Sequence, residues 1–210
     1  MAMDNEEAYN KWSATYDAVK NKTRDLEARA FRSVLSGINF STAIELGCGT
    51  GKNTVWLAEK ARKVIAVDFS TQMLDVARRK INRNNVEFVV ADIRSPWDFA
   101  PRDADLVACS LVLEHVDNLE FIFSQAKSHL SPGSFLYIGE LHPFRQYEGS
   151  QARFETESGA FVLECFTHHL SEYIRAATRQ GFSCLNLTEW FDDDSRGQAP
   201  RIIAFSFQKV

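Results

Sequence analysis

A glycine-rich turn, Gly47-Cys48-Gly49-Thr50-Gly51, follows the apolar segment Ala43 to Leu46 and constrains the fold more than any other part of the sequence. The apolar segment is typical of a buried strand, and the residues after the turn can begin a helix. Because glycine lacks a Cβ, the backbone of this turn can approach a ligand closely, and the helix offers it unpaired N–H groups. The pattern therefore predicts a strand, turn and helix that bind a nucleotide-like small molecule.

Acidic residues around the turn indicate which nucleotide fits. A dinucleotide site has a third glycine in the pattern G-x-G-x-x-G, and this sequence has Lys52 there. Glu45 would add a carboxylate at the strand end, which repels a pyrophosphate and suits a cationic ligand. Asp68 ends the next predicted strand about 20 residues later, the spacing at which an acid meets ribose hydroxyls. These residues favour an adenosine without phosphates.

Together with four later segments, the turn resembles the motifs of class I S-adenosylmethionine-dependent methyltransferases, whose first motif is E/D-x-G-x-G-x-G. The later segments are VDFS (67–70), ADI (91–93), DLVACSLVLEHV (105–116) and LSPGSFLYIGELHP (130–143). The resemblance implies S-adenosylmethionine as the cofactor and S-adenosylhomocysteine as the product. It also implies an α/β, Rossmann-like sheet of seven strands in the order 3-2-1-4-5-7-6, with the last strand antiparallel and helices on both faces.

The alternation of strand and helix signals independently predicts a sheet covered by helices. Segment 192–200 is too short for a helical crossover, so the last two strands should be antiparallel. No interdomain linker interrupts residues 1–210, which we expect to form one methyltransferase domain. Helices are expected after Ser70, after an N-cap at Asp117, and over 170–180. Strands are expected near 43–46, 64–68, 86–90, 105–110, 134–141, 183–190 and 201–208.

The resemblance also implies roles for residues at the strand ends. Asp68 would bind the ribose diol, Phe69 or Met73 would cover the adenine, and Asp92 would accept a hydrogen bond from its amino group. Alternatively, Asp68 only caps a helix, Asp92 is a turn acid, and Phe69 and Met73 are core residues. The full set expected at the cofactor is Tyr9, Trp12, Tyr16, Glu45, Gly47, Cys48, Gly49, Thr50, Gly51, Asp68, Phe69, Met73, Asp92, Ile93, Ser110 and Leu111.

Residues 1–40 precede the first strand and are predicted to form two helices. Tyr9, Trp12 and Tyr16 are spaced to form one aromatic stripe on the first helix. Segment 9–17 resembles the lead-in of small-molecule methyltransferases related to the quinone-biosynthesis C-methyltransferases (the methyltransferase type 11 group). There it covers the cofactor as a lid, and a sulfonium is attracted to aromatic ring faces. The alternative is that the stripe is core.

Two histidines are candidates for catalysis. His115 follows the fourth strand, and His142 follows the fifth at the same rim. The alternatives are that His115 fixes its loop and that His142 shapes a turn. Methyl transfer is an in-line displacement that requires a base only if the nucleophile must lose a proton. The insert 142–170, with a predicted hairpin around Glu157-Ser158-Gly159, is expected to act as a lid or as the edge of a dimer, and its aromatic residues suggest a moderately apolar acceptor.

Composition limits the classes of partner. The net charge of −4 argues against a nucleic-acid surface, and no apolar run approaches the ~20 residues of a membrane span. The first residues lack signal-peptide features, so a cytoplasmic protein is expected, as a monomer or homodimer with a small-molecule acceptor. The four cysteines lack metal-ligand or disulfide spacing, so no metal is expected. A nicotinamide oxidoreductase, a nucleic-acid methyltransferase and a non-catalytic cofactor-binding protein remain as alternatives.

Overall fold

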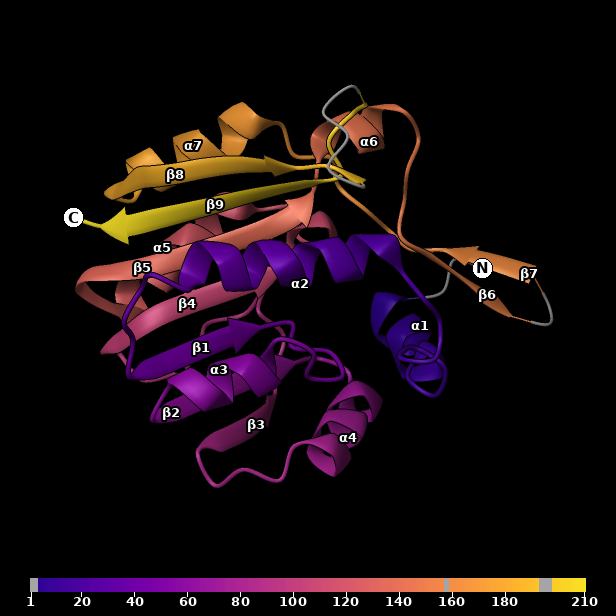
Figure 1. Ribbon diagram of the computed structural model, residues 1–210, viewed down its shortest axis with the longest axis horizontal. Coiled ribbons are helices and arrows are strands. Elements are labelled where there is room, and N and C mark those ends of the chain that lie inside the picture. The colour runs from indigo at the N-terminus through magenta and orange to yellow at the C-terminus, as the bar shows by residue number, and fades with distance from the viewer. Residues whose placement is uncertain (1–3, 157–158, 193–197) are drawn as a thin grey trace.

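The computed structural model describes residues 4–156, 159–192 and 198–210. A seven-stranded sheet in the order β3-β2-β1-β4-β5-β9-β8 forms the centre of the molecule (Figure 1). This is the predicted order, because the hairpin strands β6 and β7 belong to a separate small sheet. The strands are β1 (Thr42–Leu46), β2 (Lys63–Asp68), β3 (Val86–Val90), β4 (Ala104–Ser110), β5 (Leu130–Leu141), β6 (Arg153–Thr156), β7 (Gly159–Val162), β8 (Phe182–Trp190) and β9 (Ile202–Lys209).

The first five strands are parallel and β9 is antiparallel to both of its neighbours, as predicted. In one respect β5 differs from the prediction, because it begins at Leu130 rather than at Ser134. A register shift between Ala104 and Leu106 of β4 accompanies Pro132 and Gly133 within the strand. Proline and glycine are tolerated inside a strand at such irregularities, so these residues do not mark a separate turn.

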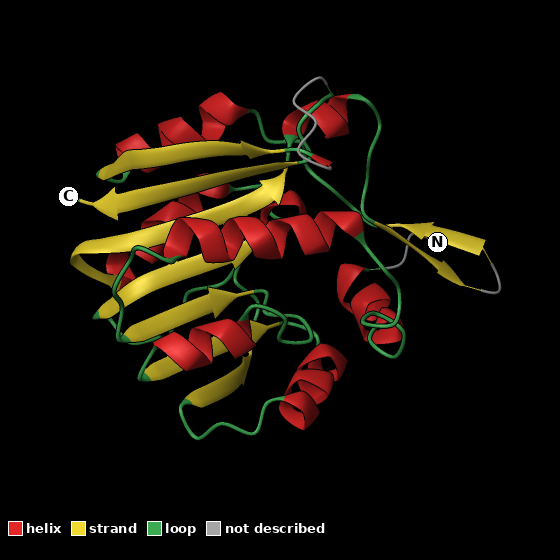
Figure 2. Cartoon of the chain, viewed as in Figure 1, coloured by secondary structure: helices red, strands yellow, loops and turns green. Residues whose placement is uncertain are grey.

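Helices cover both faces of the sheet (Figure 2). One face carries α2, α3 and α4, whose buried residues join Ala43, Val64 and Tyr137 in one core cluster. The other face carries α5 and α7, which pack with Ile138 and Phe205 in a second cluster. The helices are α1 (Asn5–Trp12), α2 (Lys22–Leu35), α3 (Thr54–Lys60), α4 (Thr71–Lys80), α5 (Leu119–His129), α6 (Pro143–Tyr147) and α7 (Leu170–Arg179), with a short 3-10 helix η1 (Leu113–His115).

One predicted start of a helix is confirmed by its cap, and the predicted cap of another helix is wrong. The hydroxyl of Ser70 accepts the N–H of Met73 and begins α4, as predicted. The cap of α5 is Asn118, whose side chain accepts the N–H of Phe121, rather than Asp117. Both residue types are good caps, so their order in the sequence could not decide between them.

The N-terminal segment crosses the carboxyl ends of the parallel strands (Figure 1). It forms two helices as predicted, but α1 ends at Trp12, so Tyr16 lies in the turns that follow rather than on the first helix. The three rings still form a chain: the centroids of Tyr9 and Trp12 are 5.8 Å apart, and those of Trp12 and Tyr16 are 4.8 Å apart. None of the helices in the described part of the chain is long and apolar enough to cross a membrane.

Candidate active site

Two adjoining cavities lie at the carboxyl ends of the parallel strands. The first cavity brings together most of the residues expected at the cofactor. Four residues line both cavities, namely Tyr9, Tyr16, Arg24 and Leu111. Of the predicted residues, the first cavity is lined by Tyr9, Tyr16, Glu45, Gly47, Cys48, Gly49, Thr50, Asp68, Phe69, Met73, Asp92, Ile93, Ser110, Leu111 and His115. The structure does not bring Trp12, Gly51 or His142 to this lining; Trp12 lines the second cavity instead.

The three glycines of the turn have different surroundings, although all have positive φ. A Cβ on Gly49 would meet nothing within 4 Å, so the absent side chain leaves space in the first cavity. A Cβ on Gly47 would lie 2.1 Å from the Cγ2 of Val112, and one on Gly51 would lie 2.5 Å from the Cδ1 of Ile81. The missing side chain of Gly47 therefore lets Val112, in the loop after β4, pack closely against the turn. The missing side chain of Gly51 does the same for Ile81, the C-cap of α4.

Asp68 ties the end of β2 to the glycine turn. Its Oδ2 accepts the N–H of Gly49 at 2.8 Å and its Oδ1 accepts the N–H of Ser70 at 2.8 Å. The carboxyl is 5% exposed and lines the first cavity. Burial raises its pKa to about 6, against the opposing effect of these hydrogen bonds. Asp68 therefore holds the backbone and also faces the cavity, so its structural role does not exclude a role in binding the ribose diol.

Glu45 is more protonated than the sequence suggested. It accepts a 2.5 Å hydrogen bond from the hydroxyl of Thr54 at the start of α3. Burial is the main cause that raises the pKa of Glu45 to about 8; the nearby Glu27 and Asp68 contribute to this rise, and the hydrogen bond from Thr54 opposes it. A cation beside this carboxyl would favour its charged form and lower the pKa again.

Glu27, from α2, was not anticipated at this site. It is 2% exposed, and its two carboxyl oxygens accept hydrogen bonds from Asn53 at 3.0 Å and from the phenol of Tyr137 at 3.2 Å. Burial raises its pKa. A signal was present in the sequence, since Glu27 stands beside Leu26 within the apolar face of a predicted helix. A carboxylate in such a face is rarely buried without partners.

His115 has hydrogen-bond partners at both ring nitrogens. Its Nδ1 lies 2.8 Å from the carbonyl oxygen of Glu164, so Nδ1 carries the proton and donates it. Its Nε2 then accepts from the phenol of Tyr9 at 2.9 Å. Burial lowers the pKa of His115 and favours the neutral ring. The ring therefore joins α1 to the insert that begins after β5.

His142 lies outside both cavities among the described residues. Its Nδ1 accepts the N–H of Phe144 at 3.1 Å and caps α6, and its Nε2 lies 3.1 Å from the carboxylate of Glu189. Burial lowers its pKa, against the effect of Glu189. These contacts match the alternative that His142 shapes a turn, because both of its nitrogens are used there.

Asp92 is held by its neighbour Arg94, and both line the first cavity. The Nε of Arg94 lies 3.0 Å from each oxygen of Asp92, and a terminal nitrogen lies 2.8 Å from Oδ2. Burial acts to raise the pKa of Asp92, but the hydrogen bonds from Arg94 outweigh it, and the pKa is lowered. Asp92 therefore faces the cavity as a charged acceptor.

The segment after α1 is attached over the first cavity by polar contacts. Asp17 accepts from the hydroxyl of Thr50 and from the ammonium of Lys80, both at 2.7 Å. Arg24 donates to the carbonyls of Tyr16 and Val19, and its guanidinium lies 3.9 Å from the centroid of the Tyr16 ring. These contacts hold residues 16–19 between α2 and the glycine turn.

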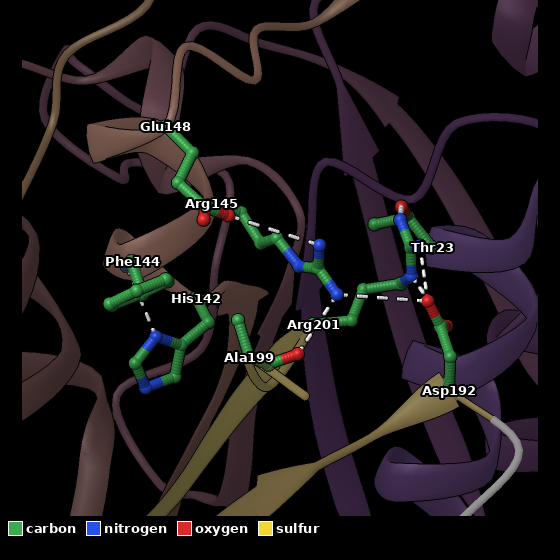
Figure 3. A network of polar contacts seen from close by, with 8 residues as sticks. All are labelled: Thr23, His142, Phe144, Arg145, Glu148, Asp192, Ala199 and Arg201. Carbon is green, nitrogen blue, oxygen red and sulfur yellow. Dashed lines mark hydrogen bonds and ion pairs between the residues drawn. The ribbon is translucent and has the colours of Figure 1, made fainter. Parts of the chain in front are cut away.

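The second cavity, of about 440 Å³, lies between the N-terminal segment and the insert. Arg201 lines this cavity and belongs to an ion-pair network in which Arg145 and Arg201 both reach the carboxylate of Asp192 (Figure 3). Arg201 also donates to the hydroxyl of Thr23 at 3.2 Å. The described residues that line this cavity are Tyr9, Trp12, Tyr16, Asn21, Thr23, Arg24, Leu111, Glu114, Leu141, Glu148, Gly149, Ser150, Gln151, Ala152 and Arg201.

One of the four residues that line both cavities has an unusual backbone. Leu111 has φ of +54°, and it is the non-glycine residue with positive φ in the described part of the chain. Its N–H donates to the carbonyl of Gly139 at 2.8 Å, which holds the bend where β4 ends. Such conformations are costly for a residue with a side chain and often occur at functional sites.

Comparison with known proteins finds methyltransferases among the similar sequences. Residues 44–138 match the family model described as "Methyltransferase domain". An uncharacterized methyltransferase of Emericella nidulans is 29% identical over 220 residues, covering 86% of this chain and 76% of that protein. The trans-aconitate 2-methyltransferase of Azoarcus sp. is 32% identical over 122 residues, covering 56% of this chain and 47% of that protein. The ubiquinone biosynthesis O-methyltransferase of Xanthomonas euvesicatoria is 29% identical, covering 72% of this chain and 63% of that protein.

Solved structures share the fold over most of the chain. A putative S-adenosylmethionine-dependent methyltransferase from Listeria monocytogenes has a TM-score of 0.76 at 21% identity, covering 89% of this chain and 99% of that chain. The DhpI–SAH complex has a TM-score of 0.73 at 23% identity, covering 96% of this chain and 93% of that chain. The matched family segment contains the glycine turn and the ends of β1, β2 and β4, which form the first cavity. These matches support the identification of the chain as a class I S-adenosylmethionine-dependent methyltransferase, with S-adenosylmethionine as its cofactor.

Proposed function

We propose that this protein transfers the methyl group of S-adenosylmethionine to a small-molecule acceptor, with the cofactor in the first cavity and the acceptor in the second. The observation that carries this proposal is that the two cavities adjoin at Tyr9, Tyr16, Arg24 and Leu111. A methyl donor and a nucleophile must meet at such a junction. Two of the similar proteins are named for transfer to trans-aconitate and for ubiquinone biosynthesis, which supports a small acceptor.

The residues of the first cavity fit the cofactor chemically. Gly49 leaves open space where a Cβ would stand, and Asp68 offers carboxylate oxygens to a ribose diol. Phe69 and Met73 provide apolar walls for the adenine, with Asp92 as the acceptor for its amino group. The methionine portion of the cofactor carries an ammonium, a carboxylate and the sulfonium. The oxygen Oδ1 of Asn53 and the Nε of Arg24 are buried without a partner among the described residues, so each can still bond a polar ligand.

The cofactor supplies an electrophilic methyl group and a neutral thioether leaving group. The chain then has to hold the nucleophile in line with that methyl group and exclude water. We assign this task to two lids, residues 1–40 and the insert 142–170, and described residues of both line the second cavity. Tyr9 and Tyr16 place aromatic rings beside a cationic donor, an arrangement that is favourable by ~0.5 to 2 kcal/mol.

No nucleic acid is part of this proposal, because the chain has a net charge of −4 and phosphate binding requires surplus positive charge. We propose that the protein acts as a monomer or homodimer. Transfer from cofactor to acceptor needs one copy of each cavity, and one chain supplies both.

Calorimetry and a labelled-methyl screen test the proposal. S-adenosylhomocysteine should bind, NAD should not, and Asp68→Asn should weaken the binding of S-adenosylhomocysteine by at least tenfold. Wild-type protein incubated with methyl-labelled S-adenosylmethionine and a metabolite extract should yield a labelled small molecule by mass spectrometry. Binding without transfer would favour the alternative of a non-catalytic cofactor-binding protein. Binding of NAD instead would favour an oxidoreductase.

A further inference from the structure

Glu114 presents a buried carboxyl group to the second cavity. It lies in η1, directly after the Leu111 bend, and its residue is 8% exposed. Its Oε2 is buried without a hydrogen-bond partner among the residues that the structure describes. A buried polar atom without a partner is costly and calls for an explanation, such as a ligand that supplies the missing contact.

The surroundings of Glu114 keep its carboxyl group close to half protonated near neutral pH. Burial raises its pKa to about 7, while hydrogen bonds from Gln146 and Cys165 oppose this effect. Other titratable groups face it from the packed elements: Glu140 of β5, Tyr9 of α1 and Tyr173 of α7. The guanidinium groups of Arg24 and Arg201 line the same cavity. A carboxyl group in this state can accept a proton at physiological pH.

The neighbouring histidine is less suited to that task. Both nitrogens of His115 are engaged, Nδ1 with the carbonyl of Glu164 and Nε2 with the phenol of Tyr9. Nε2 could take up a proton only after its hydrogen bond from Tyr9 had been broken. Glu114 requires no such change because its Oε2 is free. His115 is better described as a positioning residue for Tyr9.

We propose that the acceptor bound in the second cavity is a hydroxyl or amine compound whose proton is taken by Glu114. This inference rests on the proposed function and names the acceptor class that the proposal leaves open. The lone pair of the acceptor oxygen or nitrogen forms a bond to the methyl carbon. The carbon–sulfur bond breaks with its electron pair moving to sulfur, and the acceptor proton moves to Oε2 of Glu114. A carboxylate acceptor has no proton to lose and would not need this group.

Glu114→Gln tests the inference because glutamine keeps the shape and removes the proton acceptor. Initial rates of methyl transfer are measured from pH 6 to 9. The acceptors are the compound returned by the labelled-methyl screen, with catechol, aniline and benzoate as defined hydroxyl, amine and carboxylate probes. Wild-type kcat/KM for a hydroxyl or amine should rise with pH and level off above about 7. Glu114→Gln should lower it by about 10² to 10⁴-fold and remove the rise.

Controls separate this role from a structural one. Glu114→Gln should bind S-adenosylhomocysteine as wild type does, and Glu114→Asp should restore part of the rate. Glu120→Gln, an exposed carboxyl in α5 that pairs with Arg179, should leave rates within about twofold. Infrared difference spectra of wild type against Glu114→Gln should contain a protonated carboxyl band that titrates near pH 7.

Three results would overturn the inference. They are full activity of Glu114→Gln with an unchanged pH profile, transfer to carboxylates alone, or absence of the protonated carboxyl band at pH 6. Each leaves the proposed function standing. Cofactor binding without transfer to any acceptor would instead overturn the proposed function, and this inference with it.

Discussion

The phenol of Tyr9 donates a hydrogen bond to Nε2 of His115 across 2.9 Å, and this bond joins α1 to the loop after β4. Tyr9→Phe removes the donor and keeps the ring. One such bond contributes about 0.5 to 1.5 kcal/mol, so we expect the dissociation constant of S-adenosylhomocysteine to rise about 2- to 12-fold. Isothermal calorimetry measures it.

A second tyrosine–histidine pair provides the matched control for Tyr9. The phenol of Tyr147 lies 2.6 Å from Nδ1 of His169, and neither residue lines the first cavity. Tyr147→Phe should therefore leave the affinity for S-adenosylhomocysteine unchanged. Equal weakening by both substitutions would show that the Tyr9 bond has no specific role at the cofactor.

His115→Ala should weaken cofactor binding and turnover together. The ring joins Tyr9 to the backbone of Glu164, so its loss detaches α1 from both the loop after β4 and the insert. We expect KM for S-adenosylmethionine to rise along with the fall in kcat. A large fall in kcat at unchanged cofactor affinity would instead identify His115 as a base.

Gly49→Val should abolish cofactor binding in a folded protein. The space around a Cβ at this position is empty, so the added side chain would extend into the cavity. The positive φ adds about 1 kcal/mol of backbone cost. Calorimetry should detect no binding of S-adenosylhomocysteine. Circular dichroism and thermal melting check the fold.

Gly51→Val is the contrasting substitution in the same turn. Its Cβ would lie 2.5 Å from Ile81, so the main effect should be lower thermal stability. If Gly49→Val binds S-adenosylhomocysteine tightly, Gly49 does not border the cofactor.

Much of the fold could be predicted because the inner strands β1, β2 and β4 are short, largely apolar and mostly buried. The boundaries of the sheet strands were found within one or two residues except at β5, where Pro132 and Gly133 are typical of a turn but lie inside the strand. The ambiguity is physical, because proline and glycine are compatible both with a turn and with an irregular strand. Only the register with β4 decides between them.

The strand-end residues of the site could also be predicted, because parallel strands place their carboxyl ends at one edge. The contacts that the N-terminal segment makes at the first cavity could not be predicted. Glu27 and Arg24 reach the first cavity from α2, and Asp17 reaches Thr50 across 33 positions of sequence. Nothing local in the sequence fixes where a preceding helix docks on a sheet.

Stability should decrease as pH rises from about 5 to 8, and Glu140 should contribute to the decrease. Burial raises the pKa of Glu140 from its ordinary 4.5 to about 8. Between these values the folded protein binds more protons than the unfolded chain. The contribution is therefore complete below pH 4.5 and is lost as pH rises through about 8, at up to about 1.4 kcal/mol per pH unit.

Glu140→Gln tests this dependence. Oε1 of Glu140 accepts the N–H groups of Val112 and Leu113, and a glutamine oxygen can do the same. The variant should show a flatter decline of melting temperature with pH than wild type, and a higher melting temperature at pH 8.5. Parallel melting curves for the two proteins would contradict the assignment.

The left-handed backbone of Leu111 limits how this enzyme can diversify. Glycine, asparagine and aspartate tolerate that conformation best, whereas β-branched side chains are strongly disfavoured there. Since the same residue borders both cavities, any replacement alters both of them in one step. New acceptor preferences are therefore more accessible through the insert, where residues such as Gln151 and Ala152 border only the second cavity among those described.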